Sequence, residues 1–205
     1  MHMITVMIVG LAMGSTVSIA KAVGARDENK VAVSVGNTVT LFMGLSVIVA
    51  AVLLILRRSI VGVMSTPQEA AEGMVAYLTV CFIGIPFITA YNIISSILRG
   101  MGDSKTPMYF IAVACVANII LDYIFIGALG MGATGAALGT TLSQAISVVV
   151  ALPVLKKNQI RITKQDFKPR REVMGELLKT GIPISAQDGL IQIAFILITV
   201  IANRR

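Results

Sequence analysis

Two acidic side chains lie within long apolar segments, and they are the residues of this sequence best suited to chemistry. Asp122 is the first, and Asn118 precedes it by four residues, which places both on one face of a helix. A carboxylate at the centre of a membrane span costs about 2.5 to 3.5 kcal/mol, so such a group is expected to have a partner and a function. The structural alternative is that Asp122 only hydrogen-bonds to backbone or caps a helix near the membrane boundary.

A glycine-rich stretch at 127–135 predicts a turn between two helices. If the turn centres on Met131, Asp122 lies nine residues before this point and Thr140 nine after it, at equal depth in an antiparallel pair. Asn118, Asp122 and Thr140 would then offer an amide oxygen, a carboxylate and a hydroxyl, hard oxygen ligands that suit a small cation such as Na⁺. A carboxylate removed from water is equally suited to bind a proton. The spacing therefore predicts a site for Na⁺ or H⁺.

Asp188 is the second acid and follows Pro183 by five residues. A proline bends a helix and leaves a backbone carbonyl unpaired, so a functional bend in which Asp188 contacts an ion or a substrate is one interpretation. The other is that Asp188 is simply hydrated near the inner interface. No catalytic constellation accompanies these acids, since the only histidine is His2 and no Cys/His metal spacing occurs. An enzyme is therefore not expected.

The composition indicates the elements that must position these side chains. Of the 205 residues, 56% are hydrophobic and 13% are charged, whereas soluble domains carry about 25% charged residues. A soluble enzyme, a disulfide scaffold and a disordered binder are thereby excluded. Backbone groups in lipid must be paired within their own segment, so the long apolar runs predict an all-α bundle of about six transmembrane helices. The expected spans are 1–20, 31–56, 73–98, 107–127, 134–155 and 177–202.

Basic residues predict the orientation of the spans. Thirteen of the 17 Lys and Arg residues fall in every second loop, which places those loops in the cytoplasm. The thirteen are Lys21, Arg26, Lys30, Arg99, Lys105, Lys156, Lys157, Arg161, Lys164, Lys168, Arg170, Arg171 and Lys179. The segment 156–175 is expected to lie near anionic membrane lipids rather than nucleic acid. The orientation puts the N-terminus outside, so we expect an internal piece of a longer protein.

Several motifs resemble those of multidrug and toxic compound extrusion (MATE) transporters. They are Arg-Gly-Met-Gly-Asp-Ser-Lys-Thr-Pro-Met at 99–108, Asn-Ile-Ile-Leu-Asp at 118–122, the stretch 130–144, and the segments 10–14 and 24–27. That family has twelve helices in two lobes of six. The resemblance implies that the chain holds the second to seventh helices, without the first helix and most of the second lobe. Residues 1–155 would be N-lobe helices, 156–175 a cytoplasmic basic linker, and 176–205 the first C-lobe helix.

The resemblance also implies a function. Family members exchange Na⁺ or H⁺ for organic cations and other amphipathic small molecules by alternating access, with no cofactor beyond the coupling ion. A plasma-membrane location, in a prokaryote the inner membrane, is expected. Ion ligands in such members include an Asn and an Asp on the fifth helix and a Thr on the sixth, which match Asn118, Asp122 and Thr140. Where relatives carry an acid on the seventh helix, this sequence has Ile191, so the resemblance does not assign that role to Asp188.

Two alternatives stay open at this point. One is a lipid-precursor or polysaccharide flippase of the same superfamily, which has larger cavities and more helices. The other is a membrane scaffold subunit that transports nothing, in which Asp122 and Thr140 need not converge.

Overall fold

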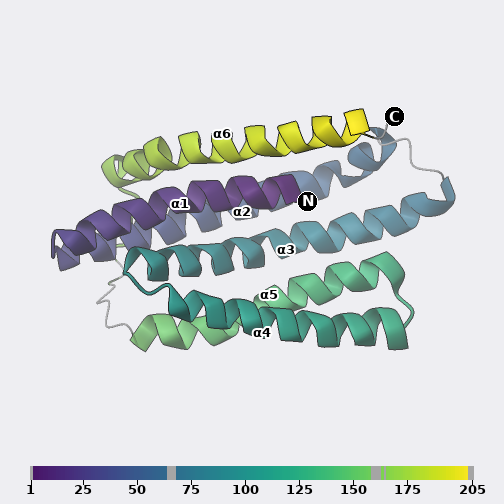
Figure 1. Cartoon of the computed structure of the whole chain (residues 1–205), viewed down its shortest axis with the longest axis horizontal. Helices are drawn as coiled ribbons and strands as arrows, with labels where there is room; N and C mark the ends of the chain where they lie inside the picture. The colour runs from purple at the N-terminus through teal and green to yellow at the C-terminus, as the bar shows by residue number, and fades with distance from the viewer. Residues whose placement is uncertain (1, 64–67, 158–162, 164, 203–205) are drawn as a thin grey trace. The chain divides into compact units, whose positions relative to one another are not determined.

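Helices joined by short turns make up the described residues of the computed structural model, which are 2–63, 68–157, 163 and 165–202. The predicted all-α bundle is confirmed (Figure 1). Its elements are α1 (His2–Gly24), α2 (Glu28–Val63), α3 (Gln68–Gly100), α4 (Lys105–Asp122), the π-helix η1 (Tyr123–Ala128), α5 (Gly132–Lys157) and α6 (Arg171–Ala202). Each of the six expected spans coincides with one α-helix of this part of the chain, and η1 continues the fourth.

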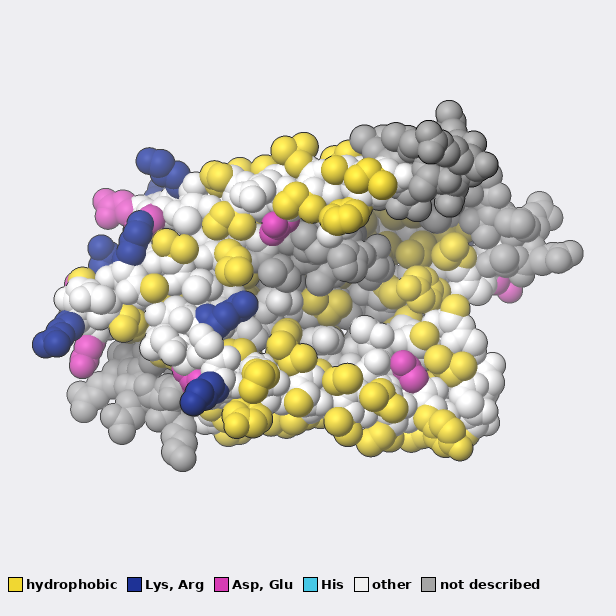
Figure 2. All heavy atoms as spheres, viewed as in Figure 1, with side chains coloured by type: hydrophobic (Ala, Val, Ile, Leu, Met, Phe, Trp, Pro, Cys, Tyr) yellow, Lys and Arg dark blue, Asp and Glu magenta, His cyan; other side chains and the backbone are white. Residues whose placement is uncertain are grey.

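Four of the described helical segments are long and apolar enough to cross a membrane. They are Glu28–Gly62, Ala71–Gly100, Lys105–Ala128 and Gly132–Leu155. Many large apolar side chains point away from the protein: Ile55 is 80% exposed and Leu190 68%. Figure 2 shows hydrophobic side chains spread along α4 and α5. Exposed apolar surface on this scale indicates a lipid environment rather than water.

The residues fall into two compact units, and helices α2 and α3 contribute to both. The first unit contains α1, α2 up to Leu41, the end of α3 from Ser95, and α6. Within it, α1 and α6 run side by side (Figure 1). A Cβ at Gly14 would lie 2.6 Å from Leu177 O, and one at Gly181 would lie 2.7 Å from Leu11 O. The two backbones therefore touch, as small residues allow between membrane helices.

The segment before α6 is held on α2 by Asn37, whose side chain is fully buried. Its Nδ2 donates to the backbone oxygens of Val33, at 2.9 Å, and Asp166, at 3.2 Å. Its Oδ1 accepts from the backbone N–H of Arg170 at 2.7 Å. Gly36 leaves the space for this contact, because a Cβ there would overlap Asp166 O.

The second unit contains the rest of α2 and α3 together with α4, η1 and α5. Helices α4 and α5 form an antiparallel hairpin (Figure 1). Its turn uses Gly130 and Gly132 at φ of +64° and +54°, values that glycine adopts without strain. Ser147 Oγ of α5 donates to Phe110 O of α4 at 3.1 Å, which joins the two helices far from the turn. On its other side, α5 packs against α3, where a Cβ at Gly84 would lie 2.7 Å from Thr141 Oγ1.

Candidate functional site

Asp122 lies at the end of α4 and faces α5. Its Oδ1 occupies the space that a side chain at Gly139 would take, because a Cβ built there overlaps this oxygen. Asp122 and Thr140, the residue after Gly139, are therefore close to the same level of the hairpin. Glycine at 139 is what lets the carboxylate approach the backbone of α5.

The helix changes form directly after Asp122. Residues Tyr123–Ala128 form a π-helix, in which Leu129 N–H donates to Ile124 O at 2.9 Å. Such π-helical turns inside longer helices are frequent at functional sites, since they change the direction of nearby side chains and the pairing of the backbone. The apolar run predicts an ordinary helix here, because its composition gives no signal for the wider turn.

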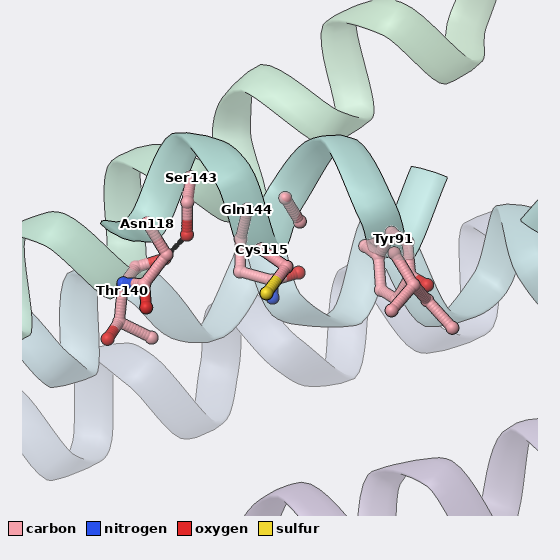
Figure 3. A pocket seen from close by; sticks show the side chains of 8 residues that line it. Tyr91, Cys115, Asn118, Thr140, Ser143 and Gln144 are labelled. Atoms are coloured by element: carbon pink, nitrogen blue, oxygen red, sulfur yellow. Dashed lines mark hydrogen bonds between the residues drawn. The ribbon is translucent and has the colours of Figure 1, made fainter. Parts of the chain in front are cut away.

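A cavity of about 240 Å³ lies between α3, α4 and α5, and its lining includes Asn118, which precedes Asp122 by one helical turn. Asn118 and Thr140, two of the residues predicted from the sequence, both line it, whereas Asp122 is not among its lining residues. The full lining is Tyr91, Ile111, Ala114, Cys115, Asn118, Thr140, Ser143 and Gln144. Figure 3 shows Asn118 and Thr140 together at one end, Cys115 and Gln144 in the middle, and Tyr91 at the other end.

Three polar atoms of this hairpin are buried without a hydrogen-bond partner among the described residues. They are Asn118 Nδ2, Asp122 Oδ1 and Gln144 Oε1. An unpaired buried polar atom costs about 1 to 3 kcal/mol, and more if it is charged. Two acceptors and one donor left unpaired within one helix hairpin indicate a place that a polar ligand or water fills.

The Thr140 and Ser143 hydroxyls of the cavity donate to their own helix. Thr140 Oγ1 donates to Ala136 O at 3.0 Å, and Ser143 Oγ donates to Thr140 O at 2.8 Å, the bond drawn in Figure 3. Each hydroxyl has a single proton, so its oxygen lone pairs stay available to accept. Both oxygens can therefore coordinate a cation or accept a hydrogen bond from water.

The charge of the site limits which ion it fits. Among the described residues, no group of three or more His, Cys, Asp and Glu side chains is placed to hold a metal ion. Asp122 instead supplies one negative charge beside neutral oxygens. Divalent cations generally require more carboxylates or thiolates, so one carboxylate suits a monovalent ion.

Asp188 belongs to the first compact unit, whereas Asn118, Asp122 and Thr140 belong to the second. It lies on the α1 side of α6, with Oδ2 at 3.0 Å from the position of a Cβ on Gly10. Its carboxylate is therefore at the contact between α1 and α6.

Sequence reasoning missed four polar residues of the cavity: Tyr91, Cys115, Ser143 and Gln144. Gln144 had a signal, since it follows Thr140 by one helical turn inside an apolar span. Tyr91 had none, because its contribution depends on how α3 packs against the hairpin.

The MatE family model matches residues 1–124. The probable multidrug resistance protein YpnP of Bacillus subtilis is 35% identical over 180 residues, which are 88% of this chain and 40% of YpnP. The chain thus spans about two fifths of the length of this curated relative.

Solved structures agree with the sequence match. The outward-facing conformation of a multidrug resistance MATE family transporter has a TM-score of 0.86 at 31% identity, over 95% of this chain and 44% of that chain. The inward-facing conformation of such a transporter has the same TM-score and identity, over 94% and 44%. These relatives are transporters rather than enzymes, and the apolar helices make this chain a multi-pass membrane protein. The chain belongs to the multidrug and toxic compound extrusion (MATE) family.

Proposed function

We propose that this chain forms part of an antiporter that exports organic cations and other amphipathic compounds, driven by Na⁺ or H⁺. Asp122 binds the coupling ion, with Asn118 and Thr140 as neutral oxygen ligands. The observation that carries the proposal is the buried Oδ1 of Asp122, which lies against Gly139 and has no hydrogen-bond partner among the described residues. A negative group so placed gains more from a bound cation than it would in water, because the surroundings screen the attraction less.

The proposed organisation follows the family's two lobes. Residues 1–155 belong to the first lobe, 156–175 form a basic cytoplasmic linker, and 176–205 begin the second lobe. The other partners are a preceding helix and the rest of the second lobe. The hydrogen bonds between Asn37 and the segment before α6 support a linker anchored on the first lobe.

Coupling needs two conformations with different affinities for the ion and the drug. An ion that binds one state more tightly shifts the population towards it, and the drug shifts the population towards the other. The two ligands then lower each other's affinity by the same factor. The solved relatives in outward- and inward-facing conformations support such a pair of states.

The test is the substitution Asp122→Asn in the full-length protein, which removes the charge and keeps the size of the side chain. We expect drug efflux to fall to the level of cells without the transporter, while the amount in the membrane stays unchanged. The matched control is Asp27→Asn, because Asp27 is exposed and its Oδ1 accepts from Lys30 N–H at the start of α2. Wild-type efflux by Asp122→Asn would contradict the proposal that Asp122 binds the coupling ion.

Asp188 is proposed as a second contact for the ion or the substrate. The same assay tests it, since Asp188→Asn should then change the half-saturating ion or drug concentration. If both concentrations stay at the wild-type value, Asp188 has no part in transport.

A further inference from the structure

The unpaired polar atoms of the hairpin do not match a bare cation. Asp122 Oδ1 and Gln144 Oε1 are acceptors, and a cation can satisfy both. Asn118 Nδ2 is a donor, and a cation leaves it unpaired. A water molecule both donates and accepts, so water, alone or around the ion, can pair with all three.

The cavity has the size for several waters, and polar atoms form part of its lining. A water in the liquid takes up about 30 Å³, and the cavity measures about 240 Å³. A buried water also needs two to four polar partners. Six of the eight lining residues carry polar or thiol groups on the side chain, in contrast with Ile111 and Ala114.

These groups follow one another along the cavity. In Figure 3, Asn118 and Thr140 lie at one end, Cys115 and Gln144 come next, and Tyr91 is last. Asn118 is also one helical turn from Asp122, so the polar row leads towards the carboxylate. Gln144 is the member of the row whose buried oxygen has no protein partner among the described residues.

We propose that Gln144 is a positioning residue for the coupling ion: its amide oxygen holds water in the α3–α4–α5 cavity, through which the hydrated ion reaches Asp122. This role rests on the ion site proposed above. Gln144 accepts a hydrogen bond from water, and that water accepts from Asn118 Nδ2. The ion exchanges its hydration water for protein ligands in steps and does not cross a dry gap between helices.

The test replaces the amide by an apolar group of similar size, Gln144→Leu, in the full-length protein in proteoliposomes. We expect the half-saturating concentration of the coupling ion to rise roughly tenfold, the equivalent of one hydrogen bond. The maximal efflux rate at saturating ion should stay near wild type, because Asp122 is unchanged. The matched control is Gln165→Leu, since Gln165 is exposed and lies outside the helices.

The rate at which Cys115 is chemically modified gives a second test of this proposal, and it does not depend on transport. The Cys115 thiol lines the cavity, whereas the other cysteine, Cys81, is buried. The thiolate, which forms only where water reaches the sulfur, attacks a charged methanethiosulfonate reagent; a mixed disulfide forms and methanesulfinate leaves. In a Cys81→Ser background, we expect Cys115 to react and Gln144→Leu to slow the reaction several-fold.

The two proposals fail separately. If Asp122→Asn keeps ion-driven efflux, the proposed ion site is wrong. If Asp122→Asn abolishes efflux while Gln144→Leu has the wild-type ion dependence and the wild-type rate of Cys115 modification, only the role of Gln144 is overturned. Variants that do not reach the membrane are replaced by Gln144→Met, for which the same results are expected.

Discussion

The carboxylate of Asp122 lies against the backbone of Gly139, in space that any other residue at position 139 would fill. The carboxylate can take this position inside the apolar hairpin because Gly139, on the facing helix, has no side chain. The relationship makes Gly139 part of the proposed ion site although it has no functional group.

We expect Gly139→Ala to impair efflux, because the new Cβ overlaps Asp122 Oδ1 and forces the carboxylate or the helix to move. Added methylenes in packed interiors cost about 1 to 3 kcal/mol, enough for a roughly tenfold loss of ion affinity. The measurement is efflux against ion concentration. Gly44→Ala is the control, since nothing lies within 4 Å of a Cβ there. Equal ion dependence for Gly139→Ala and Gly44→Ala would show that the carboxylate does not need this space.

The contact between α1 and α6 should be equally sensitive to size. Gly14→Ala places a methyl group 2.6 Å from Leu177 O, so the helices must separate. We expect a loss of about 1 to 3 kcal/mol in stability, measured as thermal unfolding in detergent. Gly24→Ala, in the same helix with nothing within 4 Å of its Cβ, should unfold like the wild type. A wild-type midpoint for Gly14→Ala would mean that these helices are not packed so closely.

Asn37→Ala is expected to free the segment before α6. The substitution removes the hydrogen bonds to Asp166 O and from Arg170 N–H, and partners left unpaired cost about 1 to 3 kcal/mol. Trypsin should then cleave after Arg170 faster than in the wild type. The side-chain bond of Asn92 is to Ile88 O of its own helix, so Asn92→Ala should leave the cleavage rate unchanged. The same rate for both variants would rule out Asn37 as the anchor.

Asp103 should stabilise the start of α4 in a pH-dependent way. The Thr106 hydroxyl, followed by the Thr106 backbone N–H, donates to its carboxylate and lowers the pKa of Asp103 below the ordinary 3.8. A lowered folded-state pKa gives stability that is complete above the unfolded-state pKa and is lost as pH falls through the folded-state value. The difference in thermal midpoint between wild type and Asp103→Ala should therefore be constant above about pH 5 and shrink in stronger acid. A difference that persists unchanged at the lowest pH would exclude the carboxylate as its source.

The number and order of the helices could be predicted from the sequence, because each long run without charged residues indicates a membrane helix by itself. The shared level of Asp122 and the start of α5 also followed from the chain, since equal distances from a turn mean equal depth in a hairpin. Both predictions rest on local spacing.

Other features depend on contacts between distant segments. Asn37 and Asp166 are 129 positions apart, and no periodicity within α2 indicates which segment will cover it. Tyr91 of α3 lines the cavity, and Gly84 lets the same helix approach Thr141. The hydropathy of the sequence does not indicate this packing. The π-helix Tyr123–Ala128 has the same apolar composition as the helix before it.

Ion movement driven by the drug, in proteoliposomes that contain the full-length protein, is the decisive measurement. Dyes for pH and Na⁺ report the ion that crosses the membrane when the drug is added on one side. We predict that the wild type moves one of these ions against the drug and that Asp122→Asn still binds the drug but moves neither ion. Drug-driven ion movement by Asp122→Asn at the wild-type ratio would contradict ion binding at Asp122.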